Sequence, residues 1–425
     1  MLQRLTLKNF KLFDETGVTI EPGKVTVLIG VNGAGKSSVL QALLLLKQSL
    51  DSNMLMLTGP LIKLGDYRDI AHGQNVESPV DIGLVVSYKA PGLQDFTQPY
   101  ISPSGAFSYH VVANQNVIEQ TAIVTGGDGN KELEASHSSH GGAVTPENIS
   151  INNEVTLSLI ATPNIGCPFS LAPLTQGMSV QGQMIFRRVS AFLSTICTAL
   201  DQFYFVPAIR GFDALAYDVQ ATRQAEDLSA VGGSEEQAAL VANTIAANPD
   251  LVDDVTRRLN TILRDKGRLR FRTQQGRLIS EVKTERVSVN LVNEAFGLNQ
   301  LVAPLLWLSK VPRDAIVGIE EPEIHLHPRA QAALCDVFVE VATREDKQLI
   351  LTTHSEHILM GLLTAVADGR LKPDDLAVYE FQREGDTARV ERLEVNEYGQ
   401  IAGGLKGFLE TDLDEIGELI EARFR

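Results

Sequence analysis

The sequence predicts an α/β protein built on a parallel sheet, with a further lobe inserted between the two halves of that sheet. Near the N-terminus, a β-branched apolar run over residues 24–29 is followed by a glycine-rich turn and by a helix-like stretch over residues 38–47. From residue 315 onward, short apolar runs again alternate with helical ones. Such alternation indicates parallel α/β units. Because the two stretches lie far apart in the chain, we expect the intervening residues to form an insertion.

The glycine-rich turn is a complete G-x-x-x-x-G-K-S/T phosphate loop in the strand–loop–helix context that this motif requires. Glycines let backbone N–H groups surround phosphate oxygens, and the N-terminus of the helix adds the positive end of its dipole. We expect Lys36 to reach the β- and γ-phosphates and Ser37 to hold Mg²⁺. The sequence therefore predicts an ATP site. Its expected nucleotide-binding residues are Gly30, Asn32, Gly33, Ala34, Gly35, Lys36, Ser37 and Ser38.

Composition limits the class of protein. The chain has 425 residues, of which 44% are hydrophobic and 21% are charged, as in ordinary globular proteins. This length predicts two or more lobes. We expect no membrane-spanning segment and no signal peptide, because the sequence lacks an apolar stretch of the required kind. Three widely spaced cysteines form no disulfide framework, so we expect a cytoplasmic location.

The net charge of −16 argues against a protein that binds nucleic acid through its bulk charge. One local exception is the basic segment, residues 257–277. Its cationic residues are Arg257, Arg258, Arg264, Lys266, Arg268, Arg270, Arg272 and Arg277. A helix is predicted over 251–263 and a strand over 268–272, which places the three arginines of the strand on one face. Two interpretations stay open: a solvated strand face, or a surface for nucleic acid or an acidic partner.

Two further apolar strands end in residues suited to phosphate chemistry. Residues 315–319 lead into Glu320-Glu321-Pro322-Glu323, and residues 349–353 lead into His354. Ligands of open parallel sheets bind at the carboxyl ends of the strands. We expect Glu320 to orient Mg²⁺ or its water shell and Glu321 to act as general base. His354 would bond the γ-phosphate or the attacking water. The predicted catalytic set is Glu321, His354 and Lys36.

The order of these motifs resembles ABC-type ATPase heads related to SMC and RecF proteins, and more narrowly the bacterial AAA-type ATPases of the OLD class. The resemblance covers residues 1 to about 70 and about 285 to 400. The motifs that carry it are Leu7-Lys8-Asn9-Phe10-Lys11 before the phosphate loop, Ile319-Glu320-Glu321-Pro322-Glu323-Ile324-His325-Leu326-His327-Pro328 and Thr352-Thr353-His354-Ser355. It implies an ABC-type P-loop head with a mixed central sheet and flanking helices. It also implies ATP and Mg²⁺ as ligands.

In such ATPases two heads sandwich two ATP molecules, and a signature loop from the other subunit completes each site. The resemblance places this loop at residues 293–300, where Gly297 would permit close approach. Asn299 would cap the following helix and donate to the γ-phosphate. The segment lacks the family's usual Ser, and ordinary helix capping is the alternative. Gln74 stands where a Q-loop contributes to the metal site, and Glu320 stands where most relatives carry Asp.

These patterns divide the chain into five parts. They are the N-terminal part of the head (1–75), a β-rich insertion with a mobile loop near 125–148 (76–180), a mainly helical lobe (181–284), the C-terminal part of the head (285–400) and a tail helix (401–425). Only about 70 residues follow His354, too few for the TOPRIM nuclease domain of OLD nucleases. No heptad pattern predicts the coiled-coil arms of SMC proteins.

Two functions are consistent with these residues. The resemblance implies an ATPase that senses or scaffolds in prokaryotic anti-phage defence and acts through a separate effector, a nuclease. The alternative is a RecF-like, ATP-gated clamp on DNA in repair, which the basic segment supports and the overall acidity opposes. Both imply a homodimer or higher oligomer formed through the heads, and neither implies a membrane partner.

Overall fold

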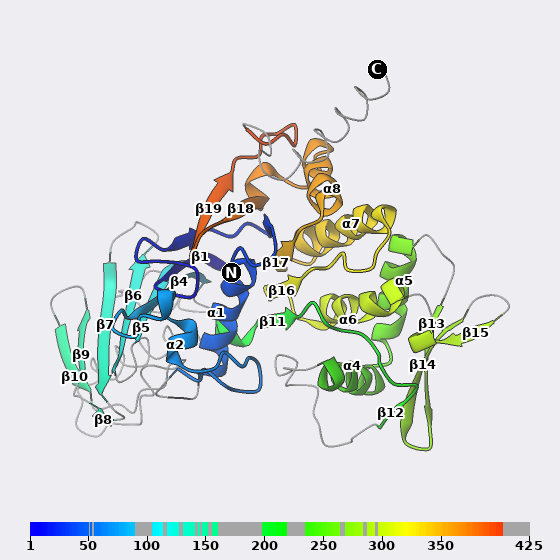
Figure 1. Ribbon diagram of the computed structural model, residues 1–425, viewed down its shortest axis with the longest axis horizontal. Helices are drawn as coiled ribbons and strands as arrows, with labels where there is room; N and C mark the ends of the chain where they lie inside the picture. Colours follow the sequence, from blue (N-terminus) through cyan, green and yellow to red (C-terminus); the bar gives the residue numbers. More distant parts are fainter. Residues whose placement is uncertain are drawn as a thin grey trace, which may run out of the picture.

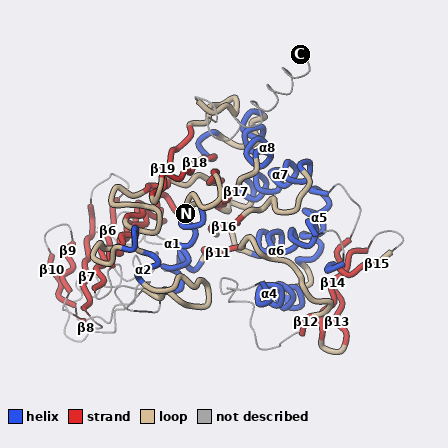
Figure 2. The backbone as a smooth tube through the Cα atoms, viewed as in Figure 1, coloured by secondary structure: helices blue, strands red, loops and turns tan. Residues whose placement is uncertain are grey.

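The computed structural model describes residues 1–50, 52, 55–89, 104–113, 117–126, 131–140, 143–144, 147–151, 155–159, 198–218, 234–263, 268–283, 287–293 and 296–402. These residues form a central, mostly parallel sheet and two antiparallel sheets, one on each side of it (Figures 1 and 2). The predicted tail helix lies almost entirely outside the described residues. No described helix is long and apolar enough to cross a membrane.

The central sheet has six strands in the order β11-β16-β17-β3-β18-β19. Their bounds are β11 (Phe203–Val206), β16 (Ile316–Glu320), β17 (Gln348–Thr353), β3 (Val25–Gly30), β18 (Leu376–Glu384) and β19 (Thr387–Leu393). The strands from β11 to β18 are parallel, and β19 pairs antiparallel with β18 at the edge. Strand β3, which leads into the phosphate loop, therefore lies between two strands from the C-terminal part of the chain. This arrangement confirms the predicted α/β fold of a P-loop head.

The side chains of β3 alternate between two hydrophobic cores. Leu28 packs into the core of α1 (Lys36–Gln48). Val27 and Ile29 pack into the opposite core. The helices of that core include α5 (Leu251–Leu263), α6 (Phe296–Lys310), α7 (Pro328–Arg344) and α8 (Glu356–Ala367). A parallel strand covered on both faces needs a continuous apolar sequence, and this is the pattern that predicts β3.

The second sheet is antiparallel and joins the N-terminal strands to the β-rich region (left in Figure 1). Its order is β10-β9-β7-β6-β5-β4-β1-β2, with β8 beside β7. The bounds are β1 (Leu2–Lys8), β2 (Val18–Ile20), β4 (Val80–Lys89), β5 (Ser104–Ala113), β6 (Val117–Gly126), β7 (Lys131–His140), β8 (Ala143–Val144), β9 (Glu147–Ile151) and β10 (Val155–Leu159). The side chain of Gln348 fixes this sheet to β17 by bonding both the N–H and the C=O of Leu2, at 2.9 and 2.8 Å.

The prediction of a loop near residues 125–148 is wrong for the residues described there, which form strands, and its predicted mobility is not tested. Strand β7 pairs with β6 from Val117–His140 to Thr125–Lys131, and β8 pairs with the end of β7. The sequence is polar here and offers no apolar alternation, which favoured a loop. An antiparallel strand satisfies its backbone by pairing with its neighbour, so a polar strand forms without that signal.

The third sheet lies on the other side of the head, beside α4 (Ser234–Ala247) and α5 (Figure 1). Its strands are β12 (Tyr217–Asp218), β13 (Arg268–Gln274), β14 (Arg277–Lys283) and β15 (Ser288–Asn290), with β14 between β12 and β13. The lobe predicted as mainly helical over 181–284 thus also contains strands, one of which, β11, belongs to the central sheet. The described residues also form the short helices α2 (Tyr67–Ile70), η1 (His72–Gln74), η3 (Leu291–Asn293) and η4 (Pro373–Asp375).

Candidate functional site

The phosphate loop occupies the turn between β3 and α1. Gly30 has a φ of 140°, and a Cβ at this position would lie 2.1 Å from the carbonyl oxygen of Phe381 on β18. Only glycine fits both constraints. Gly35 precedes α1 with a φ of 98°, and Gly33 has a φ of 76°. Ala34 and Ser38 are buried, Ser37 is half-buried, and Asn32 and Gly33 are exposed at the tip of the loop.

The Lys36 ammonium is turned into the loop. Its Nζ donates to the carbonyl oxygens of Gly30 and Val31, at 2.6 and 3.0 Å. Burial lowers the pKa of Lys36, and the charges of Glu321, Glu323 and Glu320 oppose that shift. Lys36, from the N-terminal part of the chain, therefore lies close enough to the acidic residues at the end of β16 to interact with their charges. Released from the two carbonyls, the ammonium is available for a phosphate.

The acidic turn after β16 has an unusual backbone. Glu321 has a φ of 44°, in the left-handed region that non-glycine residues seldom occupy. Its N–H donates to the carbonyl oxygen of Thr352 on β17 at 2.9 Å, so the turn is fixed to the neighbouring strand. Strained backbone of this kind persists where the surroundings over-determine it, and it concentrates at functional sites.

Glu321, Glu323 and His354 meet at the carboxyl ends of β16 and β17. The Nδ1 atom of His354 lies 2.6 Å from Oε2 of Glu321. Oε1 of buried Glu323 accepts bonds from the hydroxyl of Thr353 and from the N–H of His354, the latter at 3.1 Å. Burial, together with the neighbouring Glu323 carboxylate, raises the pKa of Glu321 to about 8. The Glu321 carboxyl therefore holds a proton more readily than an exposed glutamate, which is the property expected of a base tuned to neutral pH.

Arg210 is a site residue that the sequence did not reveal. It follows β11, is 4% exposed, and donates to the carbonyl oxygens of Glu320 and Glu321 at 2.6 and 2.9 Å. It also donates to the carbonyl oxygens of Pro207 and Gln300. Burial lowers its pKa to about 10, opposed by the nearby acidic residues. Arg210 thus holds the acidic turn, the end of β11 and helix α6 together. No local motif marks it; only its place after a central strand could have suggested a role.

The residues predicted to hold Mg²⁺ supply suitable donors. Mg²⁺ prefers oxygen ligands, and Ser37 offers a hydroxyl in the first turn of α1 while Glu320 offers a carboxylate at the end of β16. On β17, which lies between β16 and β3, the hydroxyl of Thr352 is buried without a hydrogen-bond partner. This donor set fits a magnesium ion. Gln74 is exposed in η1 with a φ of 57°, and no described contact joins it to Ser37 or Glu320, so its metal role stays a prediction.

The structure corrects the predicted role of Asn299. Asn299 lies inside α6, which begins at residue 296, so it is not the N-cap of this helix. Its side chain is buried and forms a pair of bonds with Phe212, accepting from the N–H at 2.8 Å and donating to the C=O at 2.7 Å. One N–H of the amide stays unused, but the side chain is only 3% exposed, and its contact with a phosphate of another subunit stays a prediction. The apolar residues after Asn299 allowed either a cap or an internal position, and the sequence could not decide between them.

Gly297 packs within its own chain. A Cβ at this position would lie 2.5 Å from the carbonyl oxygen of His325, in the segment that follows the acidic turn. This close approach is to the chain's own backbone and does not test the predicted approach to nucleotide. Whether Gly297 also approaches nucleotide in a dimer stays a prediction.

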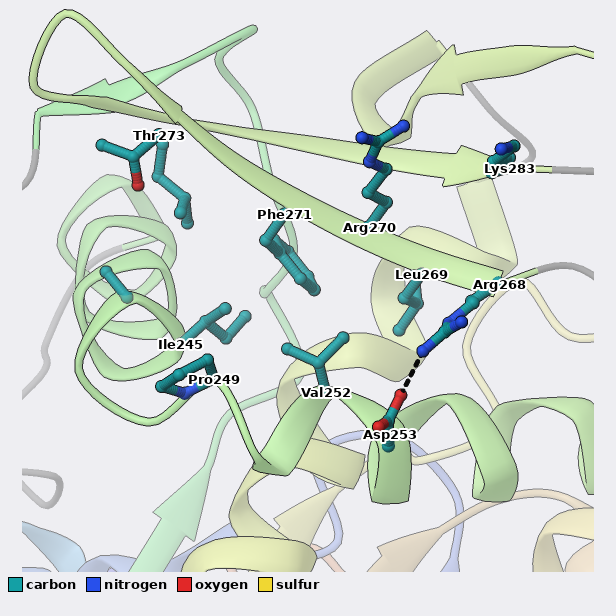
Figure 3. A pocket seen from close by; sticks show the side chains of 12 residues that line it. Ile245, Pro249, Val252, Asp253, Arg268, Leu269, Arg270, Phe271, Thr273 and Lys283 are labelled. Atoms are coloured by element: carbon teal, nitrogen blue, oxygen red, sulfur yellow. Dashed lines mark hydrogen bonds and ion pairs between the residues drawn. The ribbon is translucent and has the colours of Figure 1, made fainter.

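The basic segment forms the predicted helix and strand, and acidic residues of the same chain pair with much of it. Arg268 of β13 pairs with Asp253 of α5 at 2.8 Å (Figure 3). The other ion pairs of the described residues of the segment include Arg257–Asp254, Arg257–Glu340, Arg258–Asp254, Arg258–Glu345, Arg272–Glu281 and Arg277–Asp218. Beside β13 lies a cavity of about 560 Å³, which is lined both by apolar residues such as Ile245 and Phe271 and by charged residues such as Arg270 and Lys283 (Figure 3). Arg264 and Lys266 lie outside the described residues.

Both halves of the head match known ATPase families. Residues 1–172, which contain the phosphate loop, match the model described as "AAA ATPase domain". Residues 188–360, which contain the acidic turn and His354, match the model described as "AAA domain, putative AbiEii toxin, Type IV TA system". The two models together match most of the chain, and both descriptions name AAA domains. No curated protein matches the chain.

Three solved structures are similar over most of their length. A crystal structure of an Smc head bound to the C-winged helix domain of ScpA is 12% identical, covers 92% of this chain and 98% of its own, and has a TM-score of 0.46. The SMC head domain from Thermotoga maritima is 12% identical, with coverages of 93% and 99% and a TM-score of 0.41. A Pyrococcus furiosus Smc head with an extended coiled coil, bound to the C-terminal domain of ScpA, is 11% identical, with coverages of 98% and 99% and a TM-score of 0.44.

Proposed function

We propose that the protein is a Mg²⁺-dependent ATP hydrolase that works as a sensor or scaffold. One observation supports the proposed hydrolysis of ATP. Lys36, Glu321 and His354 come from separate segments of the chain and lie together at the carboxyl ends of β3, β16 and β17. A phosphate-binding cation, a base of raised pKa and a histidine that contacts the base are the groups that phosphoryl transfer to water needs.

Each residue has a separate role in this proposal. Lys36 leaves the carbonyl oxygens of Gly30 and Val31 and binds the phosphates. Glu321 accepts a proton from the attacking water, and His354, whose Nδ1 lies 2.6 Å from Oε2 of Glu321, orients that carboxylate. Ser37 and Glu320 would hold Mg²⁺, which neutralises charge on the phosphates when bound. Arg210 keeps the acidic turn at its distance from the loop.

We further propose that ATP joins two heads and that the output passes to a separate effector, a nuclease, in prokaryotic defence against phage. The match of residues 188–360 to a model described as a putative AbiEii toxin supports a role in that kind of system. Co-expression with neighbouring genes followed by capture of the tagged protein tests this part. A nuclease that co-purifies only when ATP is present would support it, and a chain that purifies alone in both conditions would contradict it.

The ATP-binding part is tested with Lys36→Ala. Loss of the ammonium removes the main positive charge facing the phosphates, so we expect the affinity for ATP to fall at least about tenfold. Lys372→Ala is the matched control, because Lys372 is an exposed lysine away from the loop. Calorimetric titration of both variants with ATP gives the comparison. Equal ATP affinity in the Lys36 variant and the control would contradict the proposed site.

The clamp on DNA is the weaker alternative, because acidic residues of the same chain already neutralise arginines of the basic segment. Exposed pairs of this kind can exchange partners, so a test is still informative. A salt titration of duplex binding with and without ATP separates the two functions. ATP-dependent binding that weakens steeply with salt, and is lost when Arg268, Arg270 and Arg272 are neutralised, would favour the clamp.

A further inference from the structure

Three potential metal ligands lie together at the ends of β16 and β17. Among the residues that the structure describes, Glu321, Glu323 and His354 place one ligand atom each within 4.8 Å of one another. The Nδ1 atom of His354 is 2.6 Å from Oε2 of Glu321 and 4.0 Å from Oε1 of Glu323. Ligand atoms of a tetrahedral zinc site lie about 3.4 Å apart, as follows from bonds of about 2.1 Å. Small side-chain rotations therefore suffice to place all three around one cation.

The backbone holds these ligands in position. Glu321 is fixed by its bond to Thr352, and the N–H of His354 donates to Glu323 at 3.1 Å. The two glutamates lie in the short turn after β16, and the histidine directly follows the neighbouring strand β17. Ligands on rigid, adjacent strand ends give a precise site.

A second observation points to a missing positive partner. Glu323 is 4% exposed, and its Oε2 atom is shielded from solvent and has no hydrogen-bond partner, whereas Oε1 accepts from Thr353 and His354. A buried carboxylate oxygen without a donor is costly. A cation between the three side chains would remove that cost.

We propose that Glu321, Glu323 and His354 bind a divalent cation of the zinc class when no nucleotide is present. One imidazole and two carboxylates suit Zn²⁺ or Co²⁺, whereas Mg²⁺ and Ca²⁺ prefer oxygen alone. The site is distinct from the expected magnesium donors, Ser37 and Glu320. A cation here would occupy the base and its histidine, so it would restrain hydrolysis. That consequence rests on the proposed function; the binding does not.

The test uses the full chain without nucleotide and Co²⁺ as a spectroscopic probe. We expect one saturable site with visible d–d absorption bands, and Zn²⁺ should displace the Co²⁺. Glu323→Gln and His354→Asn should each weaken binding at least about tenfold. His357→Asn is the matched control, since this exposed histidine lies in the first turn of α8 and is not part of the cluster; it should bind as the parent does.

Several outcomes would overturn the proposal. They are the absence of a saturable Co²⁺ band, a sulfur charge-transfer band that indicates cysteine ligation, and equal affinity in the parent, Glu323→Gln and His354→Asn proteins. The amide oxygen that Glu323→Gln introduces can still accept the bonds of Thr353 and His354, so folding should be preserved, and unchanged circular dichroism checks this. ATP binding by the Lys36→Ala variant tests the proposed function separately, so the two can fail independently.

Discussion

Two partly buried clusters of charge in this molecule are built in opposite ways. One joins α5, α6 and α7, where Arg258 pairs with Asp254 and Glu345 at 2.8 and 2.5 Å, and Lys347 pairs with Glu345 at 2.6 Å. Each described charge of this network has an opposite charge beside it. The other cluster is the acidic turn with His354. There the carboxylates of Glu321 and Glu323 lie side by side. The nearby Arg210 donates its hydrogen bonds to backbone carbonyl oxygens and not to these carboxylates.

The difference shows which cluster serves stability and which serves chemistry. In the helical network, burial alone would raise the pKa of Asp254, but bonds from Ser309 and Arg258 bring it to about 2. In the acidic turn, burial and like charge raise the pKa of Glu321 to about 8. A folded protein gains from the first arrangement and loses from the second. Ionisable groups whose pKa values are strongly shifted at a cost in stability are characteristic of functional sites.

The largest expected effect comes from Arg210→Met. This change leaves the carbonyl oxygens of Glu320 and Glu321 buried without donors, so we expect the free energy of unfolding to fall by about 3–5 kcal/mol. Denaturant titration of the nucleotide-free protein measures it. Arg383→Met, at an exposed arginine, is the control. A loss no larger than in the control would show that Arg210 does not support the acidic turn.

The next effect comes from breaking the compensated network with Asp254→Asn. Arg258 is buried and would lose one of its two anionic partners, so we expect a loss of about 2 kcal/mol at neutral pH. Because the folded pKa is depressed from 3.8 to about 2, this stabilisation is present above pH 3.8 and disappears as pH falls toward 2. Unfolding measured across this range should show the parent and variant converging. A constant difference would refute the ionic origin of the effect.

A smaller effect of opposite sign is expected for Glu321→Gln in the nucleotide-free protein. Between pH 4.5 and 8 the folded protein keeps a proton that the unfolded chain releases, so the stability of the parent falls as pH rises. The amide cannot ionise. We expect the variant to be more stable than the parent by about 1–2 kcal/mol at pH 8, less than the full pKa shift corresponds to because solvent screens this partly exposed carboxyl, with little difference near pH 4.5. Thermal melts at both pH values test this, and a less stable variant at pH 8 would contradict it.

The smallest effect is expected at the surface of the basic segment. Arg272 pairs with Glu281 on the neighbouring strand, and its side chain is 45% exposed. Arg272→Gln should change the free energy of unfolding by less than about 0.5 kcal/mol, because exposed pairs are screened by water and salt. Denaturant titration at low and high salt measures it. A loss as large as that of Asp254→Asn would mean that this surface belongs to the stabilising network.

The sequence predicted those parts of the site that lie at the ends of apolar strands. Lys36, Glu321 and His354 each follow such a strand, so their meeting at one sheet edge follows from the parallel topology. The sequence did not predict Arg210 as a site residue, because it follows the short strand β11 in a stretch that was expected to be helical. Asn299 was misplaced because its partner, Phe212, is far away in the sequence. Polar strand β7 lacked the apolar alternation by which exposed strands are usually predicted.

Hydrolysis of ATP by Glu321→Gln tests the role of the acidic turn most directly. If Glu321 is the general base, the variant binds ATP with the affinity of the parent, and its turnover falls at least about a hundredfold. Glu391→Gln, at an exposed glutamate on β19, controls for the loss of one negative charge and should hydrolyse at the parent rate. Phosphate release under saturating ATP and Mg²⁺ gives the rates. A Glu321 variant that turns over ATP as fast as the parent would contradict the assignment of this carboxylate as the base.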